Sequence, residues 1–202
     1  MIIYGSPPSP FVRKVSVVIE QLALSEQFQF ECPKAHPTQI NQDYYDLVPL
    51  GKIPALKLDS GQFIHDSLVI CDYLNEYAQG SLIAKGMLER AAMLTRHSIA
   101  SGATDAAVSL RYESAVRPEA LQWSPWIDAL WHKILSAIKW FENNIPQSSD
   151  LMQLDNITLA CLLGYLDFRF AERDWRGNAP KLTRWFEKVD QLNVMLSTSS
   201  NS

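Results

Sequence analysis

Three short segments of the chain carry residue types that can bind an anionic or peptide-like ligand. In the first, Ser9 precedes Pro10 at the start of an apolar-periodic stretch. Serine just before a helix, with proline at the first helical position, is a favoured start signal. The Ser9 hydroxyl is therefore predicted beside unpaired N–H groups at the positive end of a helix. Such a position suits an anion or a thiolate, although helix capping alone explains the same pattern.

The other two segments are Asp66-Ser67 and Lys52-Ile53-Pro54. Asp66 and Ser67 directly precede apolar residues at helical spacing, and both are good caps. The unpaired N–H groups of a helix start are also what a carboxylate binds. Pro54 comes just before a predicted strand, where proline is tolerated. If the bond before it is cis, the Ile53 backbone groups turn outward and can pair with a peptide as a sheet edge does. An ordinary trans proline ending a loop is the alternative.

The secondary structure predicted to position these segments changes along the chain, from mixed strands and helices to helices alone. Over residues 1–78, the order is strand, helix, strand, weak helix, strand, strand, helix. A parallel pair of strands joined by a helix, followed by a hairpin and a covering helix, makes a compact α/β sheet domain. The best-defined elements are predicted over residues 2–4, 12–24, 28–32, 55–58, 63–64 and 66–77.

A linker is predicted over residues 79–84, and an all-helical domain over residues 85–202. Apolar spacing indicates helices over about residues 85–113, 118–145, 155–172 and 179–196. The third is apolar almost all round, as a helix at the centre of a domain is. Trp123, Trp126 and Trp131 are interpreted as packing residues, in the core or between domains.

Composition argues against several classes of function. The 202 residues are 47% apolar and 20% charged, with a net charge of −4, so neither a nucleic acid nor a membrane is expected as a partner. The three cysteines are widely spaced and the four histidines form no ligand pattern, so no disulfide framework and no metal site are expected. Because the sequence shows no signal-peptide pattern, a cytoplasmic location is the default expectation.

In this order and spacing, the segments resemble those of the cytosolic glutathione transferases, over nearly the whole chain. Residues 9–13, Ser-Pro-Phe-Val-Arg, are similar to the serine version of the Cys-Pro-x-Cys start of glutaredoxins and cysteine-type transferases, as in theta-like or related bacterial classes. Residues 51–56 resemble the family's Gly-Lys-Val-Pro-x-Leu segment, whose proline is cis, and His65-Asp66-Ser67 resembles its Glu/Gln-Ser segment. The resemblance implies a thioredoxin-like N-terminal domain and a helical-bundle C-terminal domain.

The resemblance also implies roles for individual residues. Ser9 is the expected catalytic residue, as a stabiliser of the glutathione thiolate and not as a covalent nucleophile. The residues expected to bind glutathione are Lys52, Ile53, Pro54, Asp66 and Ser67. Ser67 and nearby N–H groups would take the γ-glutamyl carboxylate, Asp66 the ammonium group, and Lys52 the glycyl carboxylate. A lone exposed lysine is more often just a solvated charge, and for Arg13 both a ligand contact and a dimer contact stay open.

The second substrate is expected to be a small hydrophobic electrophile. Its pocket is predicted to be lined by Pro8, Phe11 and Tyr112, with Pro7, Arg111 and Trp123 as further candidates. A hydroxyl at position 9 cannot form a mixed disulfide with glutathione, so conjugation is favoured over thiol exchange. No cofactor is expected, because glutathione is a co-substrate. The resemblance implies a homodimer with a role in detoxification.

Two alternatives stay open on the sequence. The fold can serve as a noncatalytic binding module, and the same site can serve a glutathione-dependent isomerase or dehalogenase. One residue departs from the family's pattern, since Met152 stands three residues before Asp155. The family has a serine or threonine there, which caps the central helix of the bundle.

Overall fold

The computed structural model describes residues 1–199. Residues 200–202, the end of the predicted helical domain, lie outside the described residues. The chain forms two compact units that divide between Ala84 and Lys85. The first unit contains residues 1–84 together with the residues from Asn193 on, and the second contains residues 85–192.

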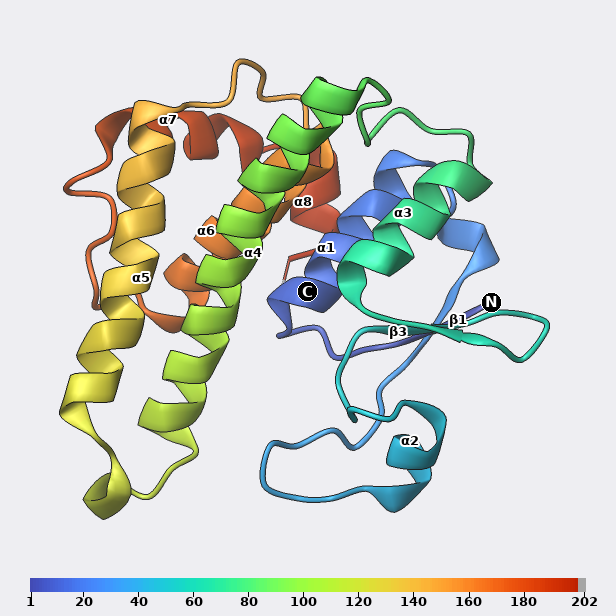
Figure 1. Cartoon of the computed structure of the whole chain (residues 1–202), viewed down its shortest axis with the longest axis horizontal. Helices are drawn as coiled ribbons and strands as arrows, with labels where there is room; N and C mark the ends of the chain where they lie inside the picture. The colour runs from blue at the N-terminus through green and yellow to red at the C-terminus, as the bar shows by residue number, and fades with distance from the viewer. Residues whose placement is uncertain (200–202) are drawn as a thin grey trace. The chain divides into compact units, whose positions relative to one another are not determined.

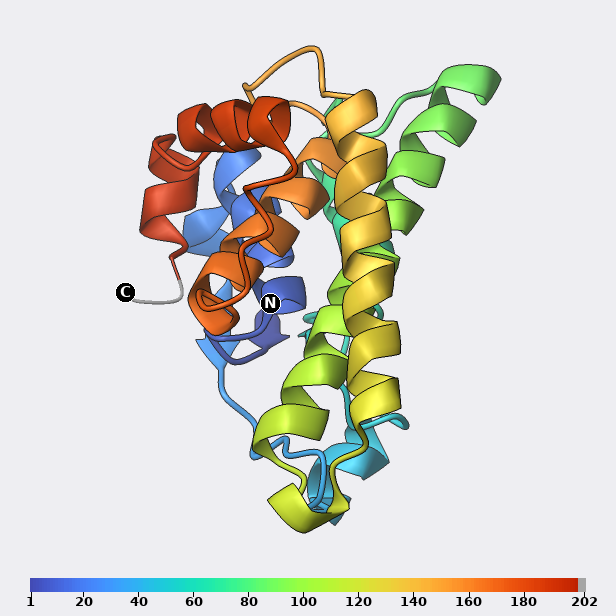
Figure 2. The same cartoon turned by 90° about the vertical axis from the view of Figure 1, so that its left-hand side faces the viewer.

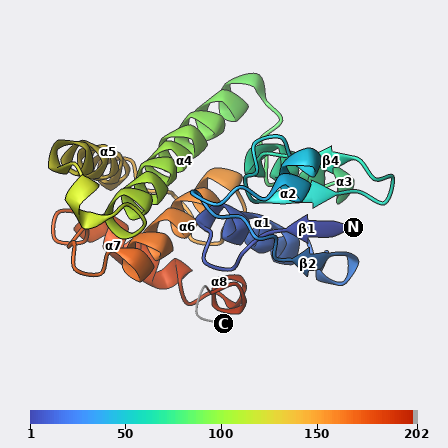
Figure 3. The same ribbon diagram turned by 90° about the horizontal axis from the view of Figure 1, so that it is seen from below.

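The first unit is built on a four-stranded sheet in the order β2-β1-β3-β4. β1 (Ile2–Tyr4) runs parallel to β2 (Gln29–Glu31), which lies beside it (Figure 3). β1 also pairs antiparallel with β3 (Ala55–Lys57), and β3 pairs antiparallel with β4 (Phe63–Ile64). α1 (Pro10–Gln21) connects the parallel pair. The predicted strand-helix-strand unit followed by a hairpin is confirmed.

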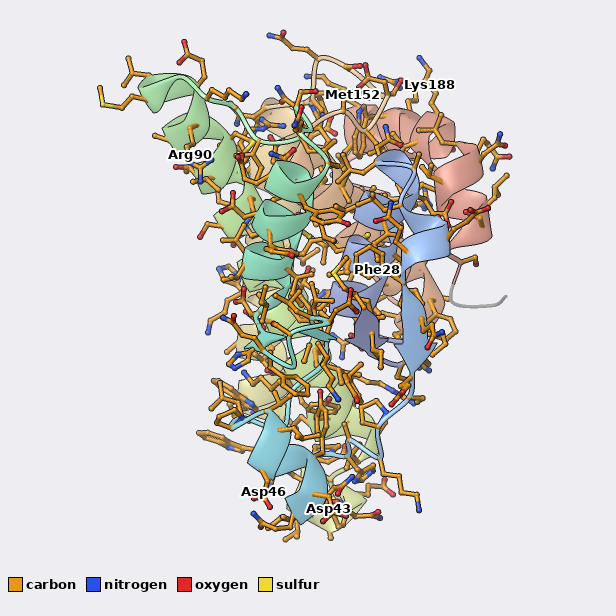
Figure 4. All side chains as sticks on the ribbon, turned by 90° about the vertical axis from the view of Figure 1, so that its right-hand side faces the viewer. Phe28, Asp43, Asp46, Arg90, Met152 and Lys188 are labelled. Carbon is orange, nitrogen blue, oxygen red and sulfur yellow. The ribbon has the colours of Figure 1, made fainter. Side chains whose placement is uncertain are left out.

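Helices cover both faces of this sheet, because successive side chains of a strand point to opposite faces. Figure 1 shows α1 and α3 (Ser67–Tyr77) on one side of the strands and α2 (Gln42–Leu47) on the other. On the α2 side, Tyr4 and Ala55 pack with the buried Tyr44. Asp43 and Asp46, on the same short helix, are exposed (Figure 4). α2 is thus held to the sheet by its apolar face.

The last described helix, α8 (Asn193–Ser197), belongs to the first unit. It packs on α1, where Arg13 donates from Nη2 to the Met195 carbonyl at 2.9 Å. The sequence predicted one continuous helix over residues 179–196, within the helical domain. That prediction is wrong, because α7 (Pro180–Val189) ends in a turn before α8 begins. The turn redirects the chain, so the buried Met195 packs within the first unit.

The second unit is all helical, and α6 (Leu154–Arg169) is its central helix. Residues 154–163 are all buried, as the apolar pattern predicted. α4 (Met87–Ala115) packs against both α5 (Ser124–Asn143) and α6, and α7 contacts α5 and α6 (Figure 2). Among residues 1–199, every helix is too short or too polar to cross a membrane. Short 3-10 turns occur at Ser25–Gln27 and Glu119–Leu121.

Of the three tryptophans predicted to be packing residues, one packs as predicted and two do not. Trp131 packs on Phe170, with ring centroids 6.2 Å apart. Trp123 and Trp126 are instead 64% and 41% exposed. They stand just before α5 and in its first turn, at the tip of the α4–α5 hairpin, where few neighbours surround a side chain.

Candidate active site

The strand register brings the three predicted segments to one end of the sheet. β1 ends where β3 begins, because Tyr4 pairs with Ala55. β4 ends beside the start of β3, because Ile64 pairs with Leu56. The loop after β1, the residues before β3 and the residues after β4 therefore meet at this end. These segments contain Ser9, Ile53-Pro54 and Asp66-Ser67.

Ser9 caps α1 through its side chain. Its backbone is extended, with φ −80° and ψ 123°, and its Oγ accepts a hydrogen bond from the Val12 N–H at 3.3 Å. Pro10 has no N–H, and the Phe11 N–H has no partner within residues 1–199. Because Oγ is the acceptor in the cap, the hydroxyl hydrogen remains available to a ligand. Two donors, the Ser9 hydroxyl and the Phe11 N–H, thus lie together at the positive end of α1.

The Ile53-Pro54 segment presents an unpaired stretch of backbone. The peptide bond between the two residues is cis, as the resemblance implies. Within residues 1–199, neither the N–H nor the C=O of Ile53 makes a hydrogen bond. Backbone groups of this kind need a partner from water or from a ligand. An extended peptide that runs beside Ile53 can supply both a donor and an acceptor.

α2 holds the preceding residue in place, which the sequence analysis missed. The Tyr44 hydroxyl donates to the Lys52 carbonyl at 2.9 Å. Burial raises the pKa of Tyr44 to about 12, and the neighbouring Tyr4 phenol adds to the rise, so Tyr44 keeps its proton at neutral pH. Gly51 has a φ of +56°, a conformation that glycine adopts without strain. The side chain of Lys52 itself is exposed.

Asp66 caps α3. Its Oδ1 accepts from the N–H groups of Leu68 and Val69 at 2.9 and 3.3 Å. Ser67 is 5% exposed, and its hydroxyl has no hydrogen bond within residues 1–199. The peptide bond between His65 and Asp66 is also cis, which the sequence did not predict. Capping occupies one carboxylate oxygen and leaves the other, with the Ser67 hydroxyl, available to a ligand.

The structure gives Arg13 a role that the sequence analysis did not predict. Its side chain is 7% exposed and its guanidinium bonds to the Met195 carbonyl. It therefore ties α8 to α1 inside the first unit.

The residues predicted to line the electrophile pocket come from both units. Pro8 and Phe11 belong to the first unit and are half-buried, and the Lys14 ammonium lies 5.8 Å from the centre of the Phe11 ring. Tyr112 belongs to α4 of the second unit and is 45% exposed. That these three side chains line one pocket stays a prediction.

Metal ligands are not gathered in the described part of the chain. Within residues 1–199, no group of three or more histidine, cysteine, aspartate and glutamate side chains is arranged to hold a metal ion. The thiols of Cys71 and Cys161 are buried, and that of Cys32 is exposed. The arrangement at the end of the sheet instead offers hydrogen-bond donors and acceptors suited to a small peptide.

Comparison with known proteins identifies the family. The profile of the glutathione S-transferase N-terminal domain matches residues 3–81, and that of the C-terminal domain matches residues 124–188. A glutathione transferase family member from Pseudomonas fluorescens Pf-5, crystallised with bound glutathione, is 34% identical. The match covers 98% of each chain with a TM-score of 0.92. The chain belongs to the glutathione transferase family.

Further members of the glutathione transferase family show the same architecture. A second Pf-5 crystal structure, with bound S-(propanoic acid)-glutathione, is 35% identical over 98% of each chain with a TM-score of 0.89. A glutathione S-transferase from Methylobacillus flagellatus KT, with glutathione bound, is 28% identical over 98% of each chain with a TM-score of 0.84. The uncharacterized GST-like protein YibF of Escherichia coli K12 is 28% identical over 194 residues, which is 94% of this chain and 93% of YibF. The predicted thioredoxin-like fold with a helical C-terminal part is confirmed.

Proposed function

We propose that the protein conjugates glutathione to small hydrophobic electrophiles. The observation that carries this proposal is the convergence of three segments with unpaired polar groups at one end of the sheet. They are the Ser9 cap, the Ile53 backbone and the Asp66-Ser67 helix start. A tripeptide with a thiol, two carboxylates and an ammonium group can pair with all of them.

Each part of glutathione has a proposed partner. The γ-glutamyl carboxylate accepts from the Ser67 hydroxyl and from N–H groups at the start of α3. The free oxygen of Asp66 accepts from the γ-glutamyl ammonium. The cysteinyl backbone pairs with Ile53 beside Pro54, and Lys52 attracts the glycyl carboxylate. The relatives that bind glutathione at 28–35% identity support this placement.

The site activates the thiol without a general base. A thiol pKa of ~8.5 must fall by about two units to give mostly thiolate at neutral pH, which takes roughly 2.7 kcal/mol. A helix N-terminus supplies about 0.3–1 kcal/mol. A hydrogen bond from the Ser9 hydroxyl to the charged sulfur adds about 1.5–3 kcal/mol. The sum reaches the requirement, so Ser9 stabilises the thiolate and forms no covalent bond.

The thiolate then attacks an electrophilic carbon, where a sulfur–carbon bond forms and a leaving group departs with its electron pair. The Pf-5 relative with bound S-(propanoic acid)-glutathione holds a glutathione thioether, the type of product such a reaction gives. That relative favours conjugation over a purely noncatalytic role. Pro8, Phe11 and Tyr112 are the proposed contacts of the electrophile, and a homodimer is the proposed assembly.

Replacement of Ser9 by alanine tests the mechanism. In Ser9→Ala we expect glutathione to bind with little change and turnover of 1-chloro-2,4-dinitrobenzene to fall about tenfold or more. The free energy of unfolding should fall only about 1 kcal/mol, from the lost cap. Ser16→Ala, on the same helix, is the matched control and should retain turnover. Unchanged turnover in Ser9→Ala would remove Ser9 from the mechanism. If the wild-type protein fails to bind millimolar glutathione, the proposed function is wrong.

A further inference from the structure

The second unit contains a cluster of two arginines and two tyrosines, of which the proposed mechanism uses only Tyr112. Arg111 and Tyr112 are neighbours on α4, and Tyr165 and Arg169 lie one turn apart on α6, which packs against α4. Tyr165 is 6% exposed and interacts electrostatically with the other three side chains. We call these four residues the α4–α6 cluster.

Both phenols of the α4–α6 cluster are hydrogen-bond donors at neutral pH. Burial has the largest effect and raises the pKa of Tyr165. The Tyr112 phenol raises this pKa further, whereas the guanidinium groups of Arg169 and Arg111 lower it. Burial also raises the pKa of Tyr112. The cluster therefore combines two permanent cations with two protonated hydroxyl groups.

Among the described residues, the two arginines of the cluster lack an acidic partner such as three other arginines of this unit have. Arg96, Arg117 and Arg176 form ion pairs with Asp155, Glu113 and Asp167, respectively. Within residues 1–199, neither Arg111 nor Arg169 has a carboxylate within ion-pair distance. The Nε of Arg169 is buried, and no described residue accepts a hydrogen bond from it. A buried donor on a cation without an acceptor costs free energy unless a ligand supplies one.

Aromatic rings hold the cluster in position. The guanidinium carbon of Arg169 lies 4.0 Å from the centre of the Phe168 ring. Phe170 makes an edge contact with Tyr165, with centroids 6.3 Å apart, and packs on Trp131. These rings restrict the side chains of α6 and give the α6 side of the cluster apolar neighbours, beside which a charged ligand group is bound more strongly than in water.

We propose that the α4–α6 cluster binds a carboxylate carried by the second substrate. A planar carboxylate accepts two parallel hydrogen bonds from a guanidinium and further bonds from the phenols. The inference rests on the proposed function, which expects the electrophile near the end of α4, where Arg111 and Tyr112 lie. It narrows the class of substrate from hydrophobic electrophiles in general to those with an acidic group.

Two aryl chlorides that differ in one carboxylate test this inference. They are 1-chloro-2,4-dinitrobenzene, which is neutral, and 4-chloro-3,5-dinitrobenzoate. With both, the glutathione sulfur bonds to the ring carbon and chloride leaves with the bonding electron pair. In Arg169→Met and Arg111→Met, we expect KM for the benzoate to rise about tenfold, because one charge-assisted contact is lost. KM for the neutral substrate should change less than about twofold. Arg184→Met, an exposed arginine on α7, is the matched control and should leave both values unchanged.

An equal rise in KM for both substrates would assign the cluster a structural role and overturn the inference. Calorimetry with S-(2-carboxyethyl)glutathione and S-propylglutathione gives an independent readout without turnover. We expect wild-type protein to bind the carboxylate conjugate about tenfold more tightly, and Arg169→Met to remove the difference. Equal affinities in wild type would overturn the inference and leave the proposed function intact. If wild type binds neither derivative, the proposed function fails, and the inference fails with it.

Discussion

At Ser9 a single oxygen atom serves the helix as an acceptor and is proposed to serve the ligand as a donor. The Ser9 Oγ accepts a hydrogen bond from the Val12 N–H, and its hydroxyl hydrogen remains available to a ligand. Asp66 divides its roles between two atoms, since Oδ1 caps α3 and the second oxygen has no partner within residues 1–199. Residues that make good caps are polar and short, which are also the properties that suit them to hold a small charged ligand at a helix start.

Asp66→Asn separates capping from ligand binding, because asparagine keeps the cap oxygen and loses the charge. We expect the free energy of unfolding to change by less than about 0.5 kcal/mol, since the two residues cap helices equally well. KM for glutathione should rise about tenfold, because a neutral amide no longer balances the γ-glutamyl ammonium. Steady-state kinetics at varied glutathione concentration and urea unfolding measure the two effects. Asp43→Asn, an exposed change on α2, is the control. An unchanged KM in Asp66→Asn would make the aspartate a cap only.

At the scale of elements, α2 contributes a support that local sequence patterns do not reveal. The starts of α1 and α3 were predictable, because Ser9-Pro10 and Asp66 are local signals that sit next to the helices they start. The six residues of α2 give only a weak helical pattern. Tyr44 acts on Lys52, a residue outside its own helix. Such a contact depends on how the turn at Gly51 folds back, so the sequence alone could not assign it.

Tyr44→Phe tests whether α2 positions the peptide-binding segment. The loss of the hydrogen bond to the Lys52 carbonyl should raise KM for glutathione about threefold, leave kcat nearly unchanged, and lower the free energy of unfolding by about 1 kcal/mol. Tyr45→Phe, at an exposed neighbouring position, should change none of these. A fall in kcat without a change in KM would contradict a positioning role.

The pKa of Tyr44 also predicts how the stabilities of wild type and Tyr44→Phe depend on pH. The pKa of Tyr44 rises from 10.0 to about 12 on folding. The folded state therefore holds its proton more tightly, and this stabilisation is complete below pH 10 and is lost as the pH rises from about 10 to 12. Urea unfolding between pH 10 and 12 should show a smaller fall in the free energy of unfolding for Tyr44→Phe than for wild type. Equal pH dependence in the two proteins would contradict the role of burial.

The helical elements show where sequence patterns are insufficient. The apolar periodicity predicted that α6 is central, yet Arg169 was not singled out. Arg111 and Arg169 belong to different helices, and their shared interaction with Tyr165 depends on how α4 crosses α6. Periodicity reports which face of a helix is buried and not which residue of another helix meets it. The turn between α7 and α8 was missed for a related reason, since apolar residues continue at helical spacing across it.

For the molecule as a whole, the stability of the helical unit depends on an ion pair that reaches three helices. No side chain among residues 1–199 caps the start of α6, and Met152, in the segment before it, is 46% exposed (Figure 4). Asp155 is only 2% exposed and bonds to Arg96 of α4 at 2.7 Å. The same arginine donates to the carbonyl of Asn144, at the end of α5, at 3.1 Å. The pair thus joins α4, α5 and α6.

Arg96→Met should lower the free energy of unfolding by about 3–5 kcal/mol, because it leaves the Asp155 carboxylate buried without a partner. The double variant Arg96→Met/Asp155→Leu should recover a large part of this loss, since no charge remains buried. Urea unfolding followed by circular dichroism measures both. A loss below about 1 kcal/mol in the single variant would show that solvent reaches Asp155 and that the pair contributes little.

The contact between Arg13 and Met195 has a consequence for how the protein is made. Because α8 completes the first unit, residues 85–192 are an insertion between two parts of one compact unit. Domains usually fold in order as the chain leaves the ribosome. Here the sheet and its peptide-binding end emerge first, but the helix that packs on α1 is translated only after the entire helical unit. The first unit is therefore the earliest to begin folding and the last to be completed.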